Sequence, residues 1–358
     1  MPLLTAEAVV PLPDPHAVLA RLTGRVAEHA AVTPSEQGAM IEHQLGRTEL
    51  VLEAGALRLR VRCADASALA FIKMVLAEHL ATAAGAPPAF AWTGHDAARR
   101  EIPYFREMTV RAAAAVTPHM RRVVLAGDAA HYAGDLLHVR LLIPPAGRAP
   151  VWPHAAADGR IAWPEGADAL TPRVYTVRHV DAARGEIALD VVLHAASGEA
   201  ATPGSAWARD VRPGDRVGLL GPGGRRLAPA DWYLLAGDET ALPAIARMAE
   251  ALPAAARAVL RIEVADAAEE QPIVSAAALD LAFLHRDGAA AGTTGLLEQA
   301  VRAVPLPQDG RRCHVWVGCE QAQARRIRAG LAERGLDPAC RSVAAYWRRG
   351  FPGIDVGD

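Results

Sequence analysis

Residues 173–178 have the sequence Arg173-Val174-Tyr175-Thr176-Val177-Arg178. The hexapeptide predicts a β-strand in which Arg173 and Tyr175 share one face, while Val174 and Thr176 share the other. Two arginines can hold a pyrophosphate through forked hydrogen bonds, a tyrosine can lie flat against a ring, and a threonine hydroxyl can bond a ring nitrogen. An ordinary strand with solvated arginines explains the hexapeptide equally well, so the motif alone leaves both interpretations open.

The hexapeptide lies in a strand-rich block that covers about residues 101–228. Short apolar or alternating runs, broken by glycine and proline, predict strands at 108–116, 122–125, 136–143, 174–180, 187–193 and 216–220. The helical signal is limited to one turn near 205–210. Closely spaced strands of this kind predict a closed antiparallel β-barrel.

The following block, 229–358, alternates strands and helices. The sequence predicts strands at 232–236, 259–264, 281–285 and 313–317, and helices at 242–252, 295–304 and 321–334. This order is typical of a doubly wound α/β domain with a mostly parallel sheet. A barrel followed by such a domain can hold two cofactors at a shared cleft.

The first block, residues 1–97, has a different pattern. It predicts a helix at 16–30, strands at 48–53 and 56–63 joined at Gly55, and a short strand at 89–92. Asp65 can cap a long helix that runs to Ala84. These elements predict a compact α+β domain with helices on an antiparallel sheet.

Composition excludes several classes of protein. A chain of 358 residues suits two or three domains, and a net charge of −2 argues against a nucleic-acid partner. No run approaches 18 apolar residues, and the start lacks the basic region of a secretory signal, so we expect no membrane span and a cytoplasmic location. The four cysteines show no metal-ligand spacing, so no metal site is predicted. The oligomeric state stays open.

The histidines are scattered, and the sequence predicts surface or core positions for them rather than ligand roles. This applies to His131, His138, His154, His179 and His285.

Six segments in the same order resemble the siderophore-interacting protein family, which is similar to ferredoxin–NADP reductases. They are 117–123, the hexapeptide 173–178, 190–194 with 204–208, 213–215 with 220–222, 237–245, and 346–350. The resemblance covers about residues 103–352 and implies an FAD-binding barrel followed by an NAD(P)-binding domain. The first block resembles a small domain of unknown function that is found alone or fused ahead of such proteins.

The resemblance also implies site residues, with Tyr175 and Thr176 in catalytic positions. FAD would be held by Arg173, Val174, Tyr175, Thr176, Val177, Arg178, Asp190, His194, Gly204, Ser205, Ala206 and Trp207. NADH or NADPH would meet Gly237, Asp238, Glu239, Thr240, Ala241, Glu320, Tyr346 and Trp347. Arg121, Arg348 and Arg349 are candidates for steering an anionic ferric chelate.

Simpler interpretations accompany three of these assignments. The amides of Ser205 and Ala206 would hold the pyrophosphate at a positive helix end, but Ser205 could instead be a helix N-cap beside a buried Trp207. Residues 237–240 could be a capped helix start, because they lack the GxGxxG fingerprint. The arginine-rich C-terminal region could be an ordinary solvated face.

One position departs from the family pattern. The family has Trp-x-Ala-Gly-Glu where this chain has Trp316-Val317-Gly318-Cys319-Glu320. If Cys319 faces the nicotinamide, its side chain would crowd the cofactor, and a thiol at a helix N-terminus would be reactive. If it points into the packing between sheet and helix, it is a small buried hydrophobe. The sequence leaves both open.

The implied function is an FAD-dependent NAD(P)H:ferric-siderophore reductase that releases iron as Fe(II) in the cytoplasm. A flavin-dependent oxidoreductase with another acceptor is a second hypothesis. The third is a non-catalytic protein that binds a ferric siderophore. Flavin content separates the third hypothesis from the others, and acceptor assays separate the first two.

Overall fold

The structure is a computed structural model that describes residues 3–27, 30–193, 202–224, 226–307 and 309–351. The chain divides into two compact units. The first unit contains Met1–Phe105 and Gly147–Leu170, and the second contains Arg106–Ala146 and Thr171–Asp358. A segment from inside the predicted barrel block therefore clusters with the N-terminal block.

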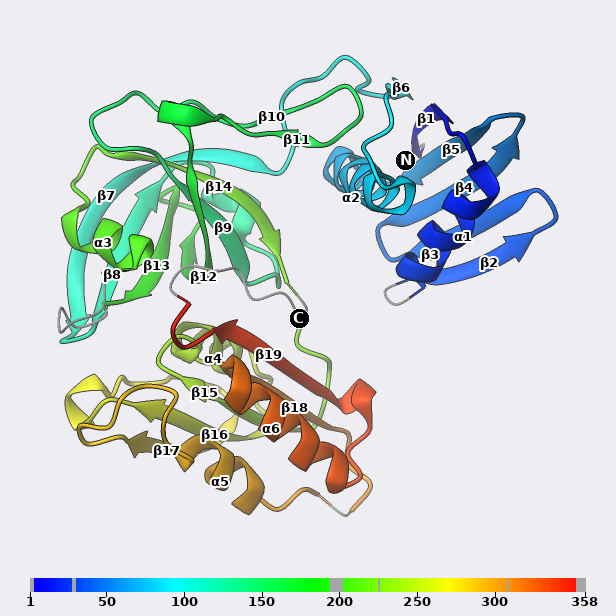
Figure 1. Ribbon diagram of the computed structural model, residues 1–358. Helices are drawn as coiled ribbons and strands as arrows, with labels where there is room; N and C mark the ends of the chain where they lie inside the picture. The colour runs from blue at the N-terminus through cyan, green and yellow to red at the C-terminus, as the bar shows by residue number, and fades with distance from the viewer. Residues whose placement is uncertain (1–2, 28–29, 194–201, 225, 308, 352–358) are drawn as a thin grey trace. The chain divides into compact units, whose positions relative to one another are not determined.

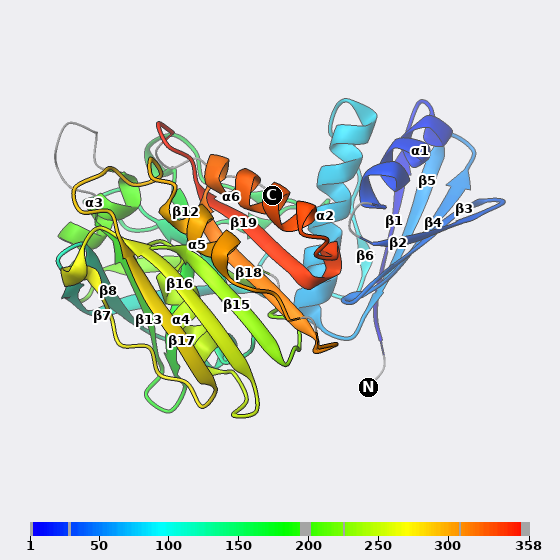
Figure 2. The ribbon, with the colours of Figure 1, turned by 90° about the horizontal axis from the view of Figure 1, so that it is seen from below.

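The first unit is a six-stranded antiparallel sheet with two helices packed against it (Figures 1 and 2). The strand order is β2-β3-β4-β5-β1-β6. Its elements are β1 Leu4–Pro11, α1 Pro15–Val26, β2 Ala31–Ser35, β3 Gly38–His43, β4 Gly46–Glu53, β5 Ala56–Cys63, α2 Ala66–Ala84 and β6 Thr93–Gly94. The predicted α+β architecture is confirmed.

Helix α2 has the predicted limits. The Asp65 carboxylate accepts a hydrogen bond from the Ala68 amide at 2.8 Å, and the helix ends at Gly85, whose φ is +80°. By length and composition α2 is the one helix among the described residues that could cross a membrane, which is weak evidence. Leu69, Leu76 and Leu80 lie in the core formed with the strands, as expected of the core helix of a globular domain.

Two details of the first block differ from the sequence prediction. Residues 89–92 are not a strand, since β6 covers Thr93–Gly94, and Trp92 is instead a core residue that is 3% exposed. Strands β1, β2 and β3 were not predicted, and α1 ends at Val26.

A hairpin from residues 147–170 completes the first unit. It contains β10 His154–Ala155, β11 Ile161–Ala162 and the short 3-10 turn Gly166–Asp168. The Trp92 amide donates to the Ala157 carbonyl at 3.1 Å, and its indole Nε1 donates to the Asp158 carbonyl at 2.8 Å. The Ala155 amide donates to the Arg100 carbonyl at 2.7 Å. The hairpin is therefore held to the rest of the first unit by two main-chain hydrogen bonds and one from the Trp92 indole.

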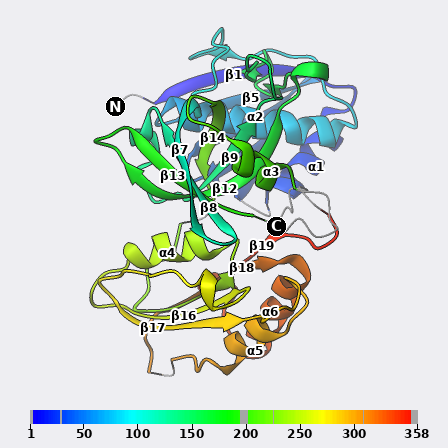
Figure 3. The same cartoon turned by 90° about the vertical axis from the view of Figure 1, so that its left-hand side faces the viewer.

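The second unit begins with the predicted barrel (Figures 1 and 3). Six antiparallel strands close in the order β12-β13-β8-β7-β14-β9 around a core that includes Val123, Leu141 and Leu189. Its elements are β7 Phe105–Thr117, β8 Met120–Ala126, a 3-10 turn Ala129–Tyr132, β9 His138–Ile143, β12 Thr171–Asp181, β13 Glu186–Val192, α3 Pro203–Asp210 and β14 Arg216–Gly223.

The barrel is followed by the predicted doubly wound domain. Five parallel strands have the order β17-β16-β15-β18-β19, with α4 on one face and α5 and α6 on the other (Figure 3). Its elements are β15 Trp232–Asp238, α4 Leu242–Glu250, β16 Arg257–Val264, β17 Ala278–His285, α5 Leu296–Ala303, β18 Cys313–Glu320, α6 Gln321–Glu333 and β19 Arg341–Trp347, with short 3-10 turns at Ala267–Glu269 and Pro338–Cys340. Strand β19 was not predicted.

Candidate functional site

Strand β12 and the start of α3 meet at the rim of the barrel. A methyl group added to Gly204 would collide with the Tyr175 hydroxyl and would lie 3.7 Å from Cγ of Arg173. Glycine is therefore what allows the first turn of α3 to approach this strand. The two sequence segments predicted to hold one ligand are adjacent in space.

The polar atoms at this rim form only some of the hydrogen bonds that they are able to form. Arg173 donates from one terminal nitrogen to the Pro172 carbonyl at 2.5 Å, while its Nε is buried and has no partner among the described residues. Burial raises the pKa of Tyr175 to about 12, with Arg173 opposing, so the phenol is neutral at physiological pH. An uncharged hydroxyl and an incompletely bonded guanidinium suit an anionic or polar ligand.

The first turn of α3 differs from both sequence interpretations. The N-cap is Thr202, not Ser205, and its hydroxyl accepts from the Ser205 amide at 3.4 Å. The Ala206 amide donates to the Thr202 carbonyl at 2.9 Å, so it is used within the helix. Ser205 is buried, and Trp207 is half-buried against the barrel core. His194 lies outside the described residues.

Three of the residues predicted to hold FAD make contacts within the protein. Asp190 is buried and forms a two-pronged ion pair with Arg122, both bonds being 2.7 Å. Arg178 forms a similar pair with Glu250 at 2.7 and 3.0 Å, and its Nε is a buried nitrogen with no partner among the described residues. The Val177 side chain lies in the barrel core, whereas Val174 is 49% exposed. The side chains of Asp190 and Val177 therefore stabilise the barrel strands.

Thr176 lies where the barrel meets the α/β domain. It is 4% exposed and pairs in register with His138 on the neighbouring strand β9. Nε2 of His138 lies 2.7 Å from the hydroxyl of Tyr346 on β19, and the two rings are arranged edge to face. This hydrogen bond therefore connects His138, on the strand beside β12, to Tyr346 on β19, which lies 208 residues later in the chain.

The carboxyl ends of β15 and β18 approach each other closely. A Cβ on Gly237 would lie 2.5 Å from the Gly318 carbonyl oxygen, and one on Gly318 would lie 3.1 Å from Cε1 of Tyr346. The turn after β15 leads through Ala241 into α4. Ligands of open α/β sheets bind at this end of the strands, so the predicted nucleotide residues are in a suitable position.

Asp238 is the best-connected residue of this turn. Its carboxylate accepts from the Thr240 amide at 2.9 Å, the Thr240 hydroxyl at 2.5 Å and Nε1 of Trp347 at 2.8 Å. Burial, together with the charge of Glu239, raises the pKa of Asp238 to about 7, with these hydrogen bonds opposing. The contact between Asp238 and Trp347 brings two predicted nucleotide residues together.

A second acidic pair flanks the turn. Glu239 binds Arg286 through two bonds of 2.7 and 2.8 Å, and Arg286 also lies 3.6 Å from the buried Glu263. Glu263 accepts from the Thr294 hydroxyl at 3.0 Å. Glu239 is therefore held in place by a buried guanidinium.

Glu320 and Cys319 end strand β18. Glu320 is the N-cap of α6, accepting from the amides of Ala322 at 2.6 Å and Gln323 at 3.1 Å, and also from the Arg349 amide at 3.3 Å. Cys319 is fully buried among apolar residues between the sheet and its helices. Burial raises the pKa of its thiol far above the ordinary value. The cleft-facing, reactive interpretation of Cys319 is wrong because the side chain points into the packing.

The three predicted substrate arginines lie on different elements. Arg121 is on β8, where one terminal nitrogen lies 3.5 Å from the Ala113 carbonyl and Nε is a buried nitrogen with no partner among the described residues. Arg348 and Arg349 are exposed after β19, and the Arg348 guanidinium lies 3.9 Å above the Phe351 ring. Among the described residues, Arg121 makes no hydrogen bond or ion pair with either of the other two.

Sequence reasoning missed three residues that organise this region. His138, assigned to surface or core, bonds Tyr346. Arg247 of α4 donates to the carbonyls of Val177 at 2.6 Å and Gly134 at 2.9 Å, and Arg286 holds Glu239. A lone histidine or arginine without a neighbouring motif gives no local signal. The described residues contain no group of three or more His, Cys, Asp or Glu side chains placed to hold a metal ion.

The barrel and the α/β domain together form a two-domain architecture that suits a flavin-binding protein. Family models agree: the Siderophore-interacting FAD-binding domain matches residues 109–226, and Siderophore-interacting protein matches 230–350. A third model, an uncharacterized protein conserved in bacteria (DUF2218), matches residues 7–93.

Relatives and solved structures extend this result. The chain is 33% identical over 194 residues to ferric vibriobactin reductase of Vibrio cholerae, spanning 53% of this chain and 69% of that protein. It is 29% identical over 255 residues to the NADPH-dependent ferric-chelate reductase of Escherichia coli, spanning 68% and 92%. A siderophore utilization protein from T. fusca superposes with a TM-score of 0.59 at 39% identity, covering 70% of this chain and 95% of that one.

This chain belongs to the siderophore-interacting protein family. It spans 65% of the length of another curated relative, an uncharacterized protein of Mycobacterium tuberculosis to which it is 41% identical over 192 residues.

The residues at the barrel rim fit FAD. The buried Nε atoms of Arg173 and Arg178 lack partners among the described residues, and Gly204 opens the first turn of α3 to the neutral Tyr175. These features leave hydrogen-bond donors available for an anionic group, next to the Tyr175 ring. The predicted FAD therefore agrees with both the family models and the donor set, and the predicted nicotinamide donor agrees with the name of the Escherichia coli relative.

Proposed function

We propose that this protein is an FAD-dependent NAD(P)H:ferric-siderophore reductase that acts in the cytoplasm. The supporting observation is the His138–Tyr346 hydrogen bond, which links the strand beside Thr176 to the turn region at Gly318. It joins the two ligand-binding regions that such a reaction requires. The names of the Vibrio cholerae and Escherichia coli relatives support the same activity.

The proposed division of labour follows the sequence blocks. Residues 101–228 hold FAD, residues 229–358 hold NADH or NADPH, and residues 1–97 form a separate α+β domain. When bound, FAD supplies the conversion between a two-electron donor and one-electron acceptors. One NAD(P)H then reduces two ferric ions and releases one proton. Fe(II) has a lower charge than Fe(III), so oxygen chelators hold it less tightly and the iron is released.

The protein's own residues bind and position the reactants. Arg173 donates to the phosphate part of the cofactor, and Tyr175, whose phenol stays neutral, packs beside the ring and can donate a hydrogen bond. Thr176 places its hydroxyl at the buried end of the motif. Trp347 and Tyr346 close the nucleotide turn through Asp238 and His138.

The ferric chelate is the substrate, and many chelates of this kind are anionic. Arg348 and Arg349 are exposed cations next to the nucleotide turn, since the Arg349 amide contacts Glu320. Exposed cations raise the local concentration of anionic substrates through long-range attraction. Arg121 is a weaker candidate for this role, because its guanidinium is partly buried.

An anaerobic spectroscopic titration tests the proposal. The purified full chain is scanned for flavin absorbance, reduced with NADH or NADPH, and then mixed with a ferric chelate in the presence of an Fe(II)-trapping dye. We expect bleaching by the nucleotide, return of the absorbance on adding the chelate, and two trapped Fe(II) for each NAD(P)H.

Other results of this titration would distinguish the two alternative functions. A colourless protein that takes up no FAD supports a non-catalytic carrier. Bleaching that persists after several ferric chelates but reverses with a quinone or free flavin supports another acceptor. Either result overturns the proposed reaction.

A further inference from the structure

Three loops at the carboxyl edge of the α/β sheet carry more negative than positive charge. They are residues 239–241, 265–277 and 286–295, which follow β15, β16 and β17 and are all described by the structure. They contain one arginine, Arg286, and no lysine. Their carboxylates are Glu239, Asp266, Glu269, Glu270 and Asp287. The contacts of Arg286 therefore decide whether this edge can bind a further anion.

Arg286 is already occupied. Its guanidinium donates twice to Glu239, at 2.7 and 2.8 Å, and lies 3.6 Å from Glu263. The side chain is 6% exposed, so a ligand in solvent scarcely reaches it. The hydroxyls after β17 are also used, since Thr293 donates to a main-chain carbonyl at 2.7 Å and Thr294 donates to Glu263 at 3.0 Å.

Asp266 and Asp287 are the carboxylates of these loops that form no ion pair within the described part of the chain. The other three each lie within 2.9 Å of a basic side chain, in the pairs Glu239–Arg286, Glu269–His119 and Glu270–His285. Asp266 and Asp287 are both exposed. They follow adjacent strands, and the strand pairing continues beyond β16 and β17, because the Asp287 amide donates to the Ala265 carbonyl at 3.0 Å.

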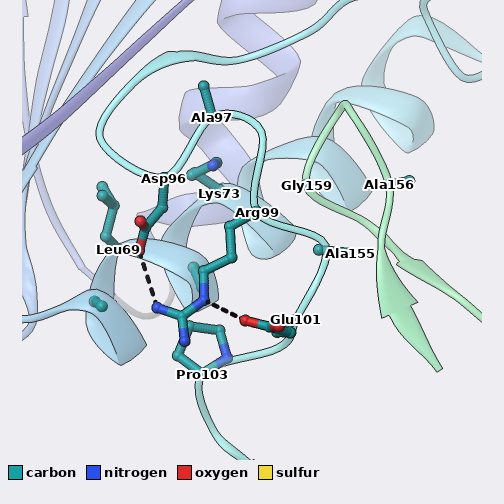
Figure 4. A pocket seen from close by; sticks show the side chains of 12 residues that line it. Leu69, Lys73, Asp96, Ala97, Arg99, Glu101, Pro103, Ala155, Ala156 and Gly159 are labelled. Atoms are coloured by element: carbon teal, nitrogen blue, oxygen red, sulfur yellow. Dashed lines mark hydrogen bonds and ion pairs between the residues drawn. The ribbon is translucent and has the colours of Figure 1, made fainter. Parts of the chain in front are cut away.

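A loop of the first unit shows the opposite arrangement. There Arg99 lies between two carboxylates, 3.3 Å from that of Asp96 and 3.2 Å from that of Glu101 (Figure 4). A guanidinium in such a position offsets part of the negative charge. The loops after β16 and β17 have no exposed arginine or lysine, so their charge acts on any ligand that approaches from solvent.

The strand order assigns the two ends of a bound dinucleotide. The order reverses between β15 and β18, beside Gly237, and doubly wound domains bind dinucleotides across such a reversal. Tyr346 of β19 bonds His138, which lies beside the proposed flavin strand β12, so the nicotinamide belongs on the side of β18 and β19. The adenosine half then extends over β16 and β17, toward Asp266 and Asp287.

We propose that the nucleotide site of this chain selects NADH over NADPH, an inference that rests on the proposed reductase function. The two nucleotides differ at the 2′ position of the adenosine ribose, which carries a hydroxyl in NADH and a phosphate of charge about −2 in NADPH. Asp266 and Asp287 can accept a hydrogen bond from the hydroxyl, as an acidic residue does in NAD-binding domains. They repel the phosphate, which meets no exposed arginine or lysine in the three loops.

The exposed Arg348 and Arg349 lie too far away to reverse this preference. They follow β19, which is three strands from β16 in the sheet order, or roughly 14 Å at the usual spacing of strands. Charges separated by more than about 8 Å are largely screened at physiological ionic strength. The selectivity also sets this chain apart from the Escherichia coli relative, whose name specifies NADPH.

Equilibrium binding of the oxidised nucleotides tests the selectivity without turnover. The full chain, loaded with FAD, is titrated with NAD⁺ and with NADP⁺ by isothermal titration calorimetry at low and at high salt. We expect NAD⁺ to bind at least tenfold more tightly at low salt, and the ratio to shrink at high salt because screening weakens the repulsion. NADP⁺ binding as tight as that of NAD⁺, or no measurable binding of either, overturns the proposal.

A double variant, Asp266→Asn with Asp287→Asn, locates the selectivity. Asparagine can accept the Ala268 amide as Asp266 does, and it tolerates the φ of +47° at Asp287, so the fold should be kept. Removing two negative charges should strengthen NADP⁺ binding about tenfold and change NAD⁺ binding less than about threefold. An unchanged NADP⁺ affinity, or an equal change for both nucleotides, contradicts the assignment.

The matched control is Asp231→Asn with Asp280→Asn. It removes the same charge from the other end of the sheet, since Asp231 directly precedes β15 and Asp280 lies near the start of β17. Both nucleotide affinities should stay at the wild-type values. An equal gain in NADP⁺ affinity in this control would mean that net charge, rather than Asp266 and Asp287, sets the preference.

The two proposals can fail separately. A chain that prefers NAD⁺ but reduces no ferric chelate contradicts the reductase function and supports the selectivity. A chain that reduces ferric chelates while binding NAD⁺ and NADP⁺ equally supports the function and overturns the selectivity.

Discussion

The two units differ in the partners of their buried charged side chains. In the second unit the buried carboxylates have partners: Asp190 is bound by Arg122, Glu263 by Arg286 and Thr294, and Asp238 by Thr240 and Trp347. In the first unit Lys73 is the buried charged residue among the described residues; its ammonium lies 5.7 Å from the Trp92 ring and is not one of the buried atoms without a partner. The buried side-chain nitrogens without a partner among the described residues, including Nε of Arg173 and of Arg178, all belong to the second unit. Its networks are therefore complete around the carboxylates and incomplete around these arginines, where a ligand can supply acceptors. The comparison separates the residues that build a fold from those that remain available for binding.

The two units also differ in which stretches of the sequence supply their key residues. The rim at Arg173 is assembled from segments that stand out in the sequence, each within the second unit. The hairpin contact of the first unit instead joins Trp92 to Ala157 and Asp158, and these two residues interrupt the barrel block. The first unit is therefore not the N-terminal block alone.

The largest expected effect concerns the contact that holds this hairpin. Trp92→Ala removes a side chain that is 3% exposed and its hydrogen bond to Asp158, so we expect a loss of about 3–5 kcal/mol in unfolding free energy. Limited proteolysis should cut the chain within 147–170, while flavin absorbance is retained. Trp163→Ala is the control, since Trp163 lies in the same segment and is 37% exposed. Equal effects of the two variants would show that the hairpin is not held by Trp92.

Arg173→Ala tests the open donor of the second unit. Losing a charge-assisted hydrogen bond of about 1.5–3 kcal/mol should weaken FAD binding tenfold to a hundredfold without unfolding the barrel. Fluorescence titration of the apoprotein measures the affinity. Arg184→Ala, at an exposed position of the same barrel, should bind FAD normally. Wild-type affinity in Arg173→Ala would remove this residue from the site.

Cys319→Gly tests whether that residue is structural. The thiol group leaves a buried strand position and glycine adds backbone freedom, so stability should fall by about 1.5–2 kcal/mol. The Michaelis constants for NADH and NADPH should stay unchanged, and alkylation of Cys319 in the folded wild type should be slow. Cys340→Ala, at a half-buried position, is the control for thiol loss. A lower Michaelis constant in Cys319→Gly would support the interpretation in which the Cys319 side chain faces the nicotinamide.

A pH-dependent effect on stability is expected from Asp238. Its pKa is about 7 in the fold against an ordinary 3.8, so between about pH 4 and pH 7 the folded chain holds this proton more tightly than the unfolded chain. Stability should therefore fall as pH rises through that window, by at most about 1.4 kcal/mol for each pH unit.

Asp238→Asn should flatten this part of the curve, measured by urea unfolding at a series of pH values. Asp280→Asn is the control, because the hydrogen bond from Arg261 lowers the pKa of Asp280 and moves its titration below the window. A slope unchanged in Asp238→Asn would mean that this carboxyl titrates elsewhere.

Local patterns were sufficient for much of the fold. The barrel strands and the strand–helix alternation follow from apolar spacing, and helix α2 follows from Asp65 and its leucines. Strand β1 was missed because its buried positions include Ala6 and Ala8, which give little hydrophobic contrast. Strand β19 is short and mixed in character, and only its position beside β18 identifies it.

The site was predictable only as far as its motifs extend. Arg173, Tyr175 and Gly204 belong to recognisable segments, and the structure brings them together. The pairing of Asp190 with Arg122 and the burial of Cys319 depend on neighbours that a linear pattern does not specify. The bond between His138 and Tyr346 crosses 208 residues, a distance at which no local signal exists.

The hairpin at residues 147–170 also sets an order of events during synthesis. Trp92 and Asp158 are 66 residues apart, so a ribosome working at about 5–20 residues per second delivers the hairpin roughly 3–13 s after the tryptophan. Throughout that interval the nascent N-terminal sheet carries an uncovered indole and an open lysine. Strand β12 begins at Thr171, directly after the hairpin. Completion of the first unit therefore waits for a segment that lies inside the barrel block, and a translational pause shortly after residue 105 would prolong the exposure of the first half to chaperones and proteases.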